Sequence, residues 1–237
     1  MTPIRMVFCL LLAAPLWATA QGRPELMDDG IFYQVLFDEL EIADLGGEEA
    51  IAWDGQAWVG TDTRRLWIKT EGERVSGDRD EVEFQLLYSR AIAPYWDLQV
   101  GFRHDFDPKP SEDWAVLSIR GLAPYFFEVE GELFIGNGGQ IELRFEADYE
   151  LLITQRFVLS PNIELNMFRE DDQQLGIGSG LSELGLGVRM RYEIRRELAP
   201  YIGLRWIRKY GATADFAKVA GTDKREVEFF AGFRFWF

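Results

Sequence analysis

The sequence predicts an all-β fold: a transmembrane antiparallel up-and-down β-barrel of about twelve strands. Three observations favour this fold. The last twelve residues alternate between apolar and polar side chains, a short proline-containing motif recurs along the chain, and the N-terminus has the composition of a secretion signal. No segment after this signal approaches the roughly 20 apolar residues of a transmembrane helix. A membrane role must therefore come from strands.

The C-terminal stretch 226–237 reads E-V-E-F-F-A-G-F-R-F-W-F. One parity is wholly apolar and consists of Val227, Phe229, Ala231, Phe233, Phe235 and Phe237. The other parity contains Glu226, Glu228 and Arg234. This pattern predicts a strand that faces lipid on one side and a polar lumen on the other. A terminal aromatic strand is also typical of bacterial outer-membrane proteins.

Residues 1–20 are expected to form a secretion signal. Arg5 provides the basic start, an apolar run follows from Met6 to Leu16, and Ala18-Thr19-Ala20 provides a cleavage site. The run is too short for a membrane anchor. The only cysteine lies inside this signal, so the mature chain is expected to lack disulfides and thiol chemistry. Residues 21–30 are expected to be a short periplasmic lead, and residues 31–237 the outer-membrane β-barrel.

Period-2 alternation and turn residues predict the strands in order. The alternation is poor in the first segment, 31–42, which we expect to close the barrel against the last strand. The strands identified directly from the sequence include residues 31–42, 50–59, 65–71, 81–90, 95–106, 125–135, 140–151, 183–195 and 226–237, and the hairpin spacing described next brings the count to about twelve.

A recurrent proline marks the hairpins between these strands. Pro94 and Pro124 each follow an alanine and precede a tyrosine, Pro161 stands in a looser copy, and Pro200 in the last copy. Proline cannot donate to a strand ladder, so each copy is expected to be a strand boundary. The segments midway between the prolines (105–113, 136–140, 170–181 and 211–224) are polar and mostly longer. Short turns at one end and longer loops at the other are typical of outer-membrane barrels, whose long loops lie outside.

The formal net charge of -15 argues against a nucleic-acid partner. On the predicted faces, the lumen receives many charged side chains. The predicted lumen acids are Glu128, Glu130, Glu132, Glu142, Glu146, Asp148, Glu164, Glu183, Glu193, Glu226 and Glu228, and the predicted lumen arginines are Arg144, Arg189, Arg191, Arg195 and Arg234. Two interpretations remain open: a structural salt-bridge network that fills a narrow barrel, and an acidic path that concentrates cations.

Several segments resemble the outer-membrane copper resistance protein B family. They are L-W-I-K-T-E-G-E at 66–73, L-L-Y-S-R-A-I-A-P-Y-W-D-L-Q-V-G-F-R-H-D-F at 86–106, G-L-A-P-Y-F-F-E at 121–128, 146–152, G-I-G-S-G-L-S-E-L at 176–184 and R-Y-E-I-R-R-E-L-A-P-Y at 191–201. The resemblance covers roughly residues 31–237. It implies an outer-membrane protein that binds copper ions and helps to move them across the outer membrane. Family members often carry a Met- and His-rich segment before the barrel, whereas residues 21–30 contain only Met27 and no histidine.

His104 is the only histidine and stands at the outer end of the strand 95–106, within G-F-R-H-D. Its parity is that of the lipid face, so an interfacial histidine is one interpretation and a copper ligand is the other. The candidate metal ligands are His104, Asp105, Glu128, Glu130 and Glu146. A catalytic nucleophile would need a serine beside His104, and Ser111 and Ser118 stand in no known catalytic motif. The sequence therefore does not predict an enzyme.

The expected function is copper binding and copper movement across the outer membrane. The alternative is a structural or general passive barrel without metal specificity. The expected partners are outer-membrane lipid, copper ions and, as a candidate, a periplasmic multicopper oxidase. No nucleic acid is expected, and the barrel is expected to be a monomer.

Overall fold

A computed structural model describes residues 30–44, 49–75, 79–108, 110–173 and 175–237. The expected signal (1–20) and all of the expected lead except Gly30 lie outside the described residues. No helix in these ranges is long and apolar enough to cross a membrane.

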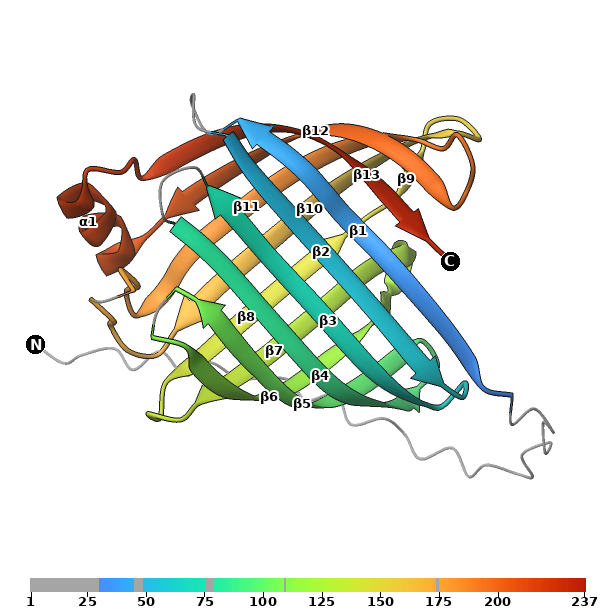
Figure 1. The fold of residues 1–237 in the computed structure, drawn as a ribbon, viewed down its shortest axis with the longest axis horizontal. Coiled ribbons are helices and arrows are strands. Elements are labelled where there is room, and N and C mark those ends of the chain that lie inside the picture. Colours follow the sequence, from blue (N-terminus) through green and yellow to red (C-terminus); the bar gives the residue numbers. More distant parts are fainter. Residues whose placement is uncertain (1–29, 45–48, 76–78, 109, 174) are drawn as a thin grey trace, which may run out of the picture.

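The described chain forms a closed antiparallel barrel (Figure 1). The strands are β1 (Phe32–Asp44), β2 (Glu49–Gly60), β3 (Arg64–Val75), β4 (Arg79–Ala93), β5 (Trp96–Asp107), β6 (Glu112–Ala123), β7 (Phe127–Gly136), β8 (Ile141–Asp148), β9 (Leu151–Leu152), β10 (Phe157–Phe168), β11 (Gly180–Tyr192), β12 (Leu198–Lys209) and β13 (Arg225–Trp236). The two-residue β9 continues the line of β8 along β10, so the wall has twelve strand positions. This confirms the predicted fold class and strand number.

The barrel closes between β1 and β13, where Phe37 faces Phe235 and Ile42 faces Ala231. The predicted partnership of the first and last strands is therefore confirmed. Between Phe37 and Glu39, β1 contains a bulge that shifts its register against both neighbours. The bulge reverses which parity faces the lumen, and this explains why the alternation of the first strand was poor in the sequence.

Two prolines occupy the predicted boundaries. Pro94 separates β4 from β5, and Pro124 starts a short 3₁₀ turn (Pro124–Phe126) between β6 and β7. The tyrosine after each proline has a left-handed backbone conformation, with φ of 67° at Tyr95 and 68° at Tyr125. Both prolines thus stand in tight turns, with two residues between the paired Ala93 and Trp96 and three between the paired Ala123 and Phe127.

For Pro161 and Pro200 the boundary prediction was wrong, because both lie within strands. The carbonyl of Pro161 accepts the Tyr149 amide, so the proline nitrogen also faces β8. It lies at the break between β8 and β9, where no ladder hydrogen bond is required of it. Pro200 precedes the first residue of β12 that pairs with β11, Tyr201.

The segment 211–224 is more ordered than the loop predicted from sequence. It contains the helix α1 (Gly211–Ala220), with alanines at four of ten positions and Gly221 in the left-handed conformation (φ 80°) as its C-cap. The loop predicted at 105–113 is shorter, because β5 continues to Asp107 and β6 begins at Glu112.

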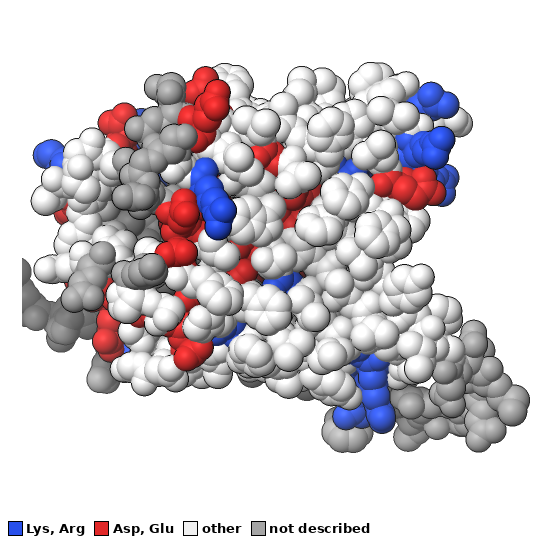
Figure 2. Space-filling view, in the orientation of Figure 1, with Lys and Arg blue, Asp and Glu red and all other residues white. Residues whose placement is uncertain are grey.

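The end of the barrel that carries α1 and the longer connections is the outer end, on the left in Figure 1, and the C-terminus lies at the opposite, periplasmic end. In Figure 2 the acidic residues gather mainly toward the outer half of the visible face, whereas several basic residues gather at the periplasmic end.

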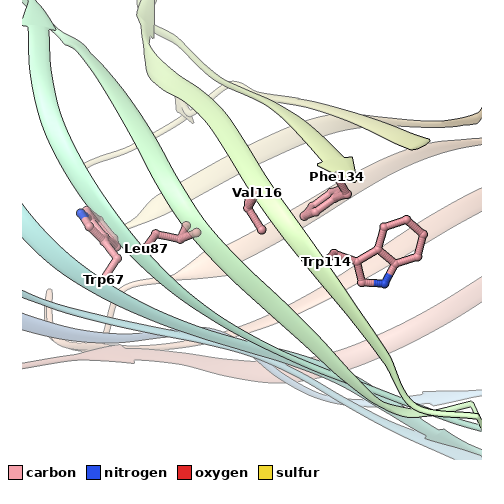
Figure 3. Close-up of a cluster of buried hydrophobic side chains, with 5 residues drawn as sticks. All are labelled: Trp67, Leu87, Trp114, Val116 and Phe134. Atoms are coloured by element: carbon pink, nitrogen blue, oxygen red, sulfur yellow. The ribbon is translucent and has the colours of Figure 1, made fainter. Parts of the chain in front are cut away.

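A small apolar cluster lies on the lumen side of β3 to β7. It consists of Trp67, Leu87, Trp114, Val116 and Phe134, all at most 5% exposed (Figure 3). Large apolar side chains on the opposite parity, such as Tyr88 and Val100, are exposed to the surroundings of the barrel. The cluster therefore fills part of the lumen, and the outer surface is apolar as a lipid-facing wall requires.

Candidate functional site

The strand register brings six acidic residues into one row across β1 to β6. Each member faces the next across a strand pair, in the order Glu39, Asp54, Glu71, Glu83, Asp105 and Glu112. We call these six residues the acidic row. Glu39 lies in the middle of β1, whereas Glu112 is the first residue of β6 at the outer end. The row therefore climbs from mid-barrel to the outer rim, as the stagger of tilted strands requires.

Basic residues cross the lumen to meet this row. Arg103 lies 2.7 Å from Asp105, 3.1 Å from Glu83 and 3.1 Å from Glu142. Arg144, on β8, lies 3.1 Å from Glu83 and 3.3 Å from Glu71 on β3. These contacts join strands on different sides of the barrel.

Lys69 of β3 makes a second crossing of this kind. Its ammonium lies 2.5 Å from Glu130 and 3.3 Å from Glu132, both on β7. We call Lys69, Arg103, Arg144 and their carboxylate partners the transverse network.

A second set of ion pairs lies beside the closure of the barrel. Asp38, the bulge residue of β1, lies 2.6 Å from Arg189 of β11 and 2.5 Å from Arg234 of β13. Arg205 of β12 lies 3.2 Å from Glu39 and 3.4 Å from Glu228. We call these residues the seam network, because they join β1 to the three strands at the other end of the sheet.

Aromatic rings pack against the arginines of both networks. The guanidinium groups of Arg103 and Arg144 lie 4.6 and 5.3 Å from the centre of the Phe134 ring. Arg205 lies 5.1 Å from the centre of the Phe230 ring in the same manner. A ring face attracts a cation and leaves the edge of the guanidinium free to bind carboxylates. The rings therefore fix the arginines in the orientation that the ion pairs require.

Other inward acids have no basic partner within ion-pair distance in the described ranges. They include Asp54, Glu112, Glu146, Asp148, Glu164 and Glu183. Glu146 faces Glu130 on one side and Glu164 on the other, so three carboxylates stand in sequence across β7, β8 and β10. The lumen thus holds a salt-bridge network together with an excess of negative charge.

The predicted metal ligands do not all converge. Glu130 and Glu146 are direct cross-strand neighbours, and Glu128 faces Asp148 further toward the periplasm. Asp105 lies near the outer end, held by Arg103 and by the indole nitrogen of Trp114 at 2.9 Å. In the described part of the chain, no three His, Cys, Asp or Glu side chains are grouped closely enough to hold a metal ion.

His104 lies on the outward side of β5, opposite Asp113 of β6. Its Nδ1 donates to Asp113 Oδ1 at 2.6 Å, and its ring packs edge-on against Phe106. Its side chain is 31% exposed. The neighbouring Asp105 points the other way, into the lumen, so these two predicted ligands lie on opposite sides of the wall.

The serines considered for catalysis lie apart from His104. Ser118 is buried on the lumen side of β6, and its hydroxyl donates to Glu130 at 3.0 Å. Ser111 is an exposed residue of the β5–β6 loop. Arg195, predicted to face the lumen, instead lies beyond the end of β11 in an exposed turn.

The loop between β10 and β11 is organised by two carboxylates at the outer end. Asp171 Oδ1 accepts the Ser179 amide at 2.6 Å, and Asp172 Oδ1 accepts the Leu175 amide at 3.2 Å. The Ser179 hydrogen bond lowers the pKa of Asp171 below its usual value. Thr213 of α1 then accepts the Gly178 amide at 2.8 Å, which attaches the loop to the helix.

Sequence reasoning missed most of the acidic row and Arg103, whereas Arg144 was among the predicted lumen arginines. Asp38 and Glu39 were hidden by the bulge, since a strict alternation cannot place two adjacent residues in the lumen. Glu71 and Glu83 do share the inward parity of their strands, and this signal was present in the sequence. Their alignment into one row depends on register, which the sequence does not state.

Comparison with known proteins shows which family and which relatives this chain is similar to. Residues 31–237 match the family described as copper resistance protein B precursor (CopB). Copper resistance protein B of Escherichia coli is 45% identical over 210 residues, which cover 89% of this chain and 71% of that protein. The copper resistance protein B homolog of Pseudomonas syringae pv. tomato is 40% identical over 219 residues, which cover 92% of this chain and 74% of that protein.

Among solved structures, the NanC porin matches with a TM-score of 0.57 and 11% identity, over 86% of this chain and 99% of the porin. The KdgM porin matches with a TM-score of 0.50 and 10% identity, over 85% of this chain and 98% of the porin. At such identities the likeness concerns the fold.

Proposed function

Because the chain belongs to the copper resistance protein B family and is an outer-membrane barrel, we propose that it binds copper ions and helps to move them across the outer membrane. The observation that carries this proposal is the acidic row, which leads from the outer rim at Glu112 to the middle of the lumen at Glu39. A row of carboxylates inside a low-dielectric wall attracts cations and raises their local concentration.

The ligand chemistry favours passage over storage. Copper binds strongly to imidazole and sulfur ligands, whereas carboxylates hold it more weakly. Conduction requires sites that are favourable enough to enter and weak enough to leave. A succession of carboxylates such as Glu130, Glu146 and Glu164 satisfies both conditions, because a cation can be handed from one to the next.

Passage also requires the basic side chains to give way. The cavity between Glu39, Asp148, Arg189 and Arg205 has a volume of only about 10 Å³, no more than a single water molecule needs. A cation that enters the row competes with Arg103 and Arg144 for the same carboxylates. The transverse network therefore acts as a barrier that a divalent cation displaces more readily than a monovalent one.

His104 is the proposed first contact at the outer end. Its Nδ1 is hydrogen-bonded to Asp113, and this fixes the ring and leaves Nε2 as the free ligand atom. We also propose that the barrel works as a monomer without catalysis, and that a periplasmic multicopper oxidase receives or supplies the copper.

The experiment compares copper uptake into liposomes for the native barrel and for the double variant Asp54→Asn/Glu146→Gln. Both acids are inward and have no ion-pair partner among the described residues, so the barrel should still fold. Uptake should fall several-fold. The matched control, Asp62→Asn, removes an exposed carboxylate from the β2–β3 turn and should leave uptake unchanged.

The alternative, a general passive barrel, makes a different prediction. It requires copper and potassium to cross at similar rates, and both rates to respond equally to the double variant. A parallel titration of copper against the native protein and His104→Asn tests the outer contact. No saturable binding in either protein would contradict a specific copper site.

A further inference from the structure

One row of outward-facing residues begins and ends with two arginines. It runs across ten strand positions in the order Arg64, Arg90, Leu98, Ile119, Gly131, Phe145, Leu165, Leu184, Arg208 and Arg225, each residue facing the next across a strand pair. The six residues between the two pairs are apolar or glycine. Because the strands are tilted, the first pair lies at the periplasmic end and the second at the outer end.

Both arginine pairs lie on the lipid-facing side of the wall. The next outward residues beside Arg64 and Arg90 are Leu66 and Tyr88, each 46% exposed. Beyond Arg225, the next outward residue of β13 is Val227, which is 50% exposed. Each pair therefore stands near the edge of the apolar band, close to the lipid headgroups, and beyond Arg90 the exposed Ile92 lies before the turn at Pro94.

The pairs differ from the arginines of the lumen in having no counter-charge. Arg103, Arg144, Arg189 and Arg205 each lie within 4 Å of at least two carboxylates. In the described ranges, none of the four outward arginines has a carboxylate within that distance. The side chain of Arg208 lies over the Tyr210 ring at 4.7 Å, a contact that leaves its charge uncompensated.

Two like charges directly opposite each other on neighbouring strands repel, since their Cβ atoms are only about 5 Å apart. A single phosphate placed between them removes this repulsion. The guanidinium fork matches two phosphate oxygens, so two facing arginines can hold one phosphate with parallel charge-assisted hydrogen bonds.

We propose that each pair binds the phosphate of a membrane lipid. Arg64 and Arg90 form the site for a phospholipid of the periplasmic leaflet, and Arg208 and Arg225 form the site for a phosphorylated glycolipid of the outer leaflet. This inference concerns the lipid-facing wall and does not depend on copper in the lumen. The two sites fix the height and tilt of the barrel in the membrane, because one lies at each end of the apolar band.

Native mass spectrometry of the detergent-solubilised barrel tests the proposal, with phosphatidylglycerol and bisphosphorylated lipid A as probes. The native protein should retain lipid at both pairs. Arg64→Gln/Arg90→Gln and Arg208→Gln/Arg225→Gln should each weaken lipid retention at least about tenfold at one site, as expected when charge-assisted hydrogen bonds are lost. The corresponding Arg→Lys variants keep the charge without the fork and should give intermediate retention.

Arg195→Gln/Arg196→Gln serves as the matched control. It removes the same charge from an exposed turn, where the arginines are adjacent in sequence and do not face each other across strands. The shift in gel mobility on heating verifies that each variant is folded. The proposal is overturned if the control loses lipid as the paired variants do, or if retention is unchanged in both paired variants. Displacement of the lipid by millimolar inorganic phosphate would overturn the lipid as occupant and indicate a free-anion site.

Discussion

The two ion-pair networks of the lumen use the same chemistry in different geometries. In the transverse network, Arg144 and Glu71 come from β8 and β3, five strand positions apart. In the seam network, Asp38 of β1 reaches Arg234 on the adjacent β13 and Arg189 on β11, three positions away. The first network fills the cross-section of the barrel, and the second reinforces the line along which the barrel closes.

Because of this difference in position, the ion pairs of the two networks have different effects on the barrel. A pair that spans the lumen obstructs it and determines what can pass. A pair that lies along the closure resists separation of the first and last strands. We therefore expect damage to the transverse network to appear mainly in permeability and damage to the seam network mainly in stability.

The largest effect is expected for Asp38→Asn. This change leaves Arg234 without its ion-pair partner and Arg189 with only Glu39, so two half-buried guanidinium groups lose a shared anion. Loss of one member of a buried ion pair typically destabilises by about 3 to 5 kcal/mol. Urea unfolding in lipid vesicles measures the loss. Asp62→Asn, in an exposed turn, is the control. Equal destabilisation of both variants would contradict the proposal that the seam network stabilises the closure of the barrel.

An intermediate effect on stability is expected for Arg144→Gln. Glu83 and Glu142 retain Arg103 as a partner, and Glu71 is more than half exposed, so the loss should be about 2 kcal/mol. Removal of the bulky cation from the lumen should raise cation conductance in planar bilayers. If conductance stays at the native level while stability falls as in Asp38→Asn, the distinction between the two networks fails.

The smallest effect is expected outside both networks, at Asp171. Its pKa is lowered in the folded protein, so its contribution to loop order is present above the ordinary aspartate pKa of 3.8 and is lost as the pH falls through the lower folded value. Hydrogen exchange at the Ser179 amide should therefore accelerate at acidic pH relative to neighbouring amides. In Asp171→Asn this additional acceleration should be absent, while exchange in β1 and β13 should be unaffected. Coupled changes in those strands would contradict the independence of the loop.

The barrel itself was predictable because its signals are local. Alternation along β13, the Ala-Pro-Tyr turns at Pro94 and Pro124, and the lengths of the loops depend only on neighbours in the sequence. The lipid-facing parity of His104 followed in the same way. The closure between β1 and β13 was predictable because an up-and-down sheet has only two ends to join.

The candidate site was much less predictable. A charge can be assigned to the lumen from parity, but its partners are set by register and by the diameter of the barrel, both of which arise from all strands together. Lys69 and Glu130 are 61 residues apart in sequence, and no local pattern connects them. Pro161 failed as a boundary for the same reason, because the break in β8 that accommodates it is a property of the neighbouring strand.

The bulge in β1 also affects how relatives of this barrel should be aligned. Upstream of Asp38 the odd-numbered residues face lipid, and downstream of it the even-numbered residues do so. A homologue that lacks one residue here would have an unbroken alternation and a more convincing strand by sequence criteria. It would also have lost the anion shared by two arginines. For this strand, a one-residue gap in an alignment therefore marks a change in the ion pairs that hold the barrel closed. A more regular alternation in β1 of a homologue indicates that the carboxylate shared by the two arginines is absent.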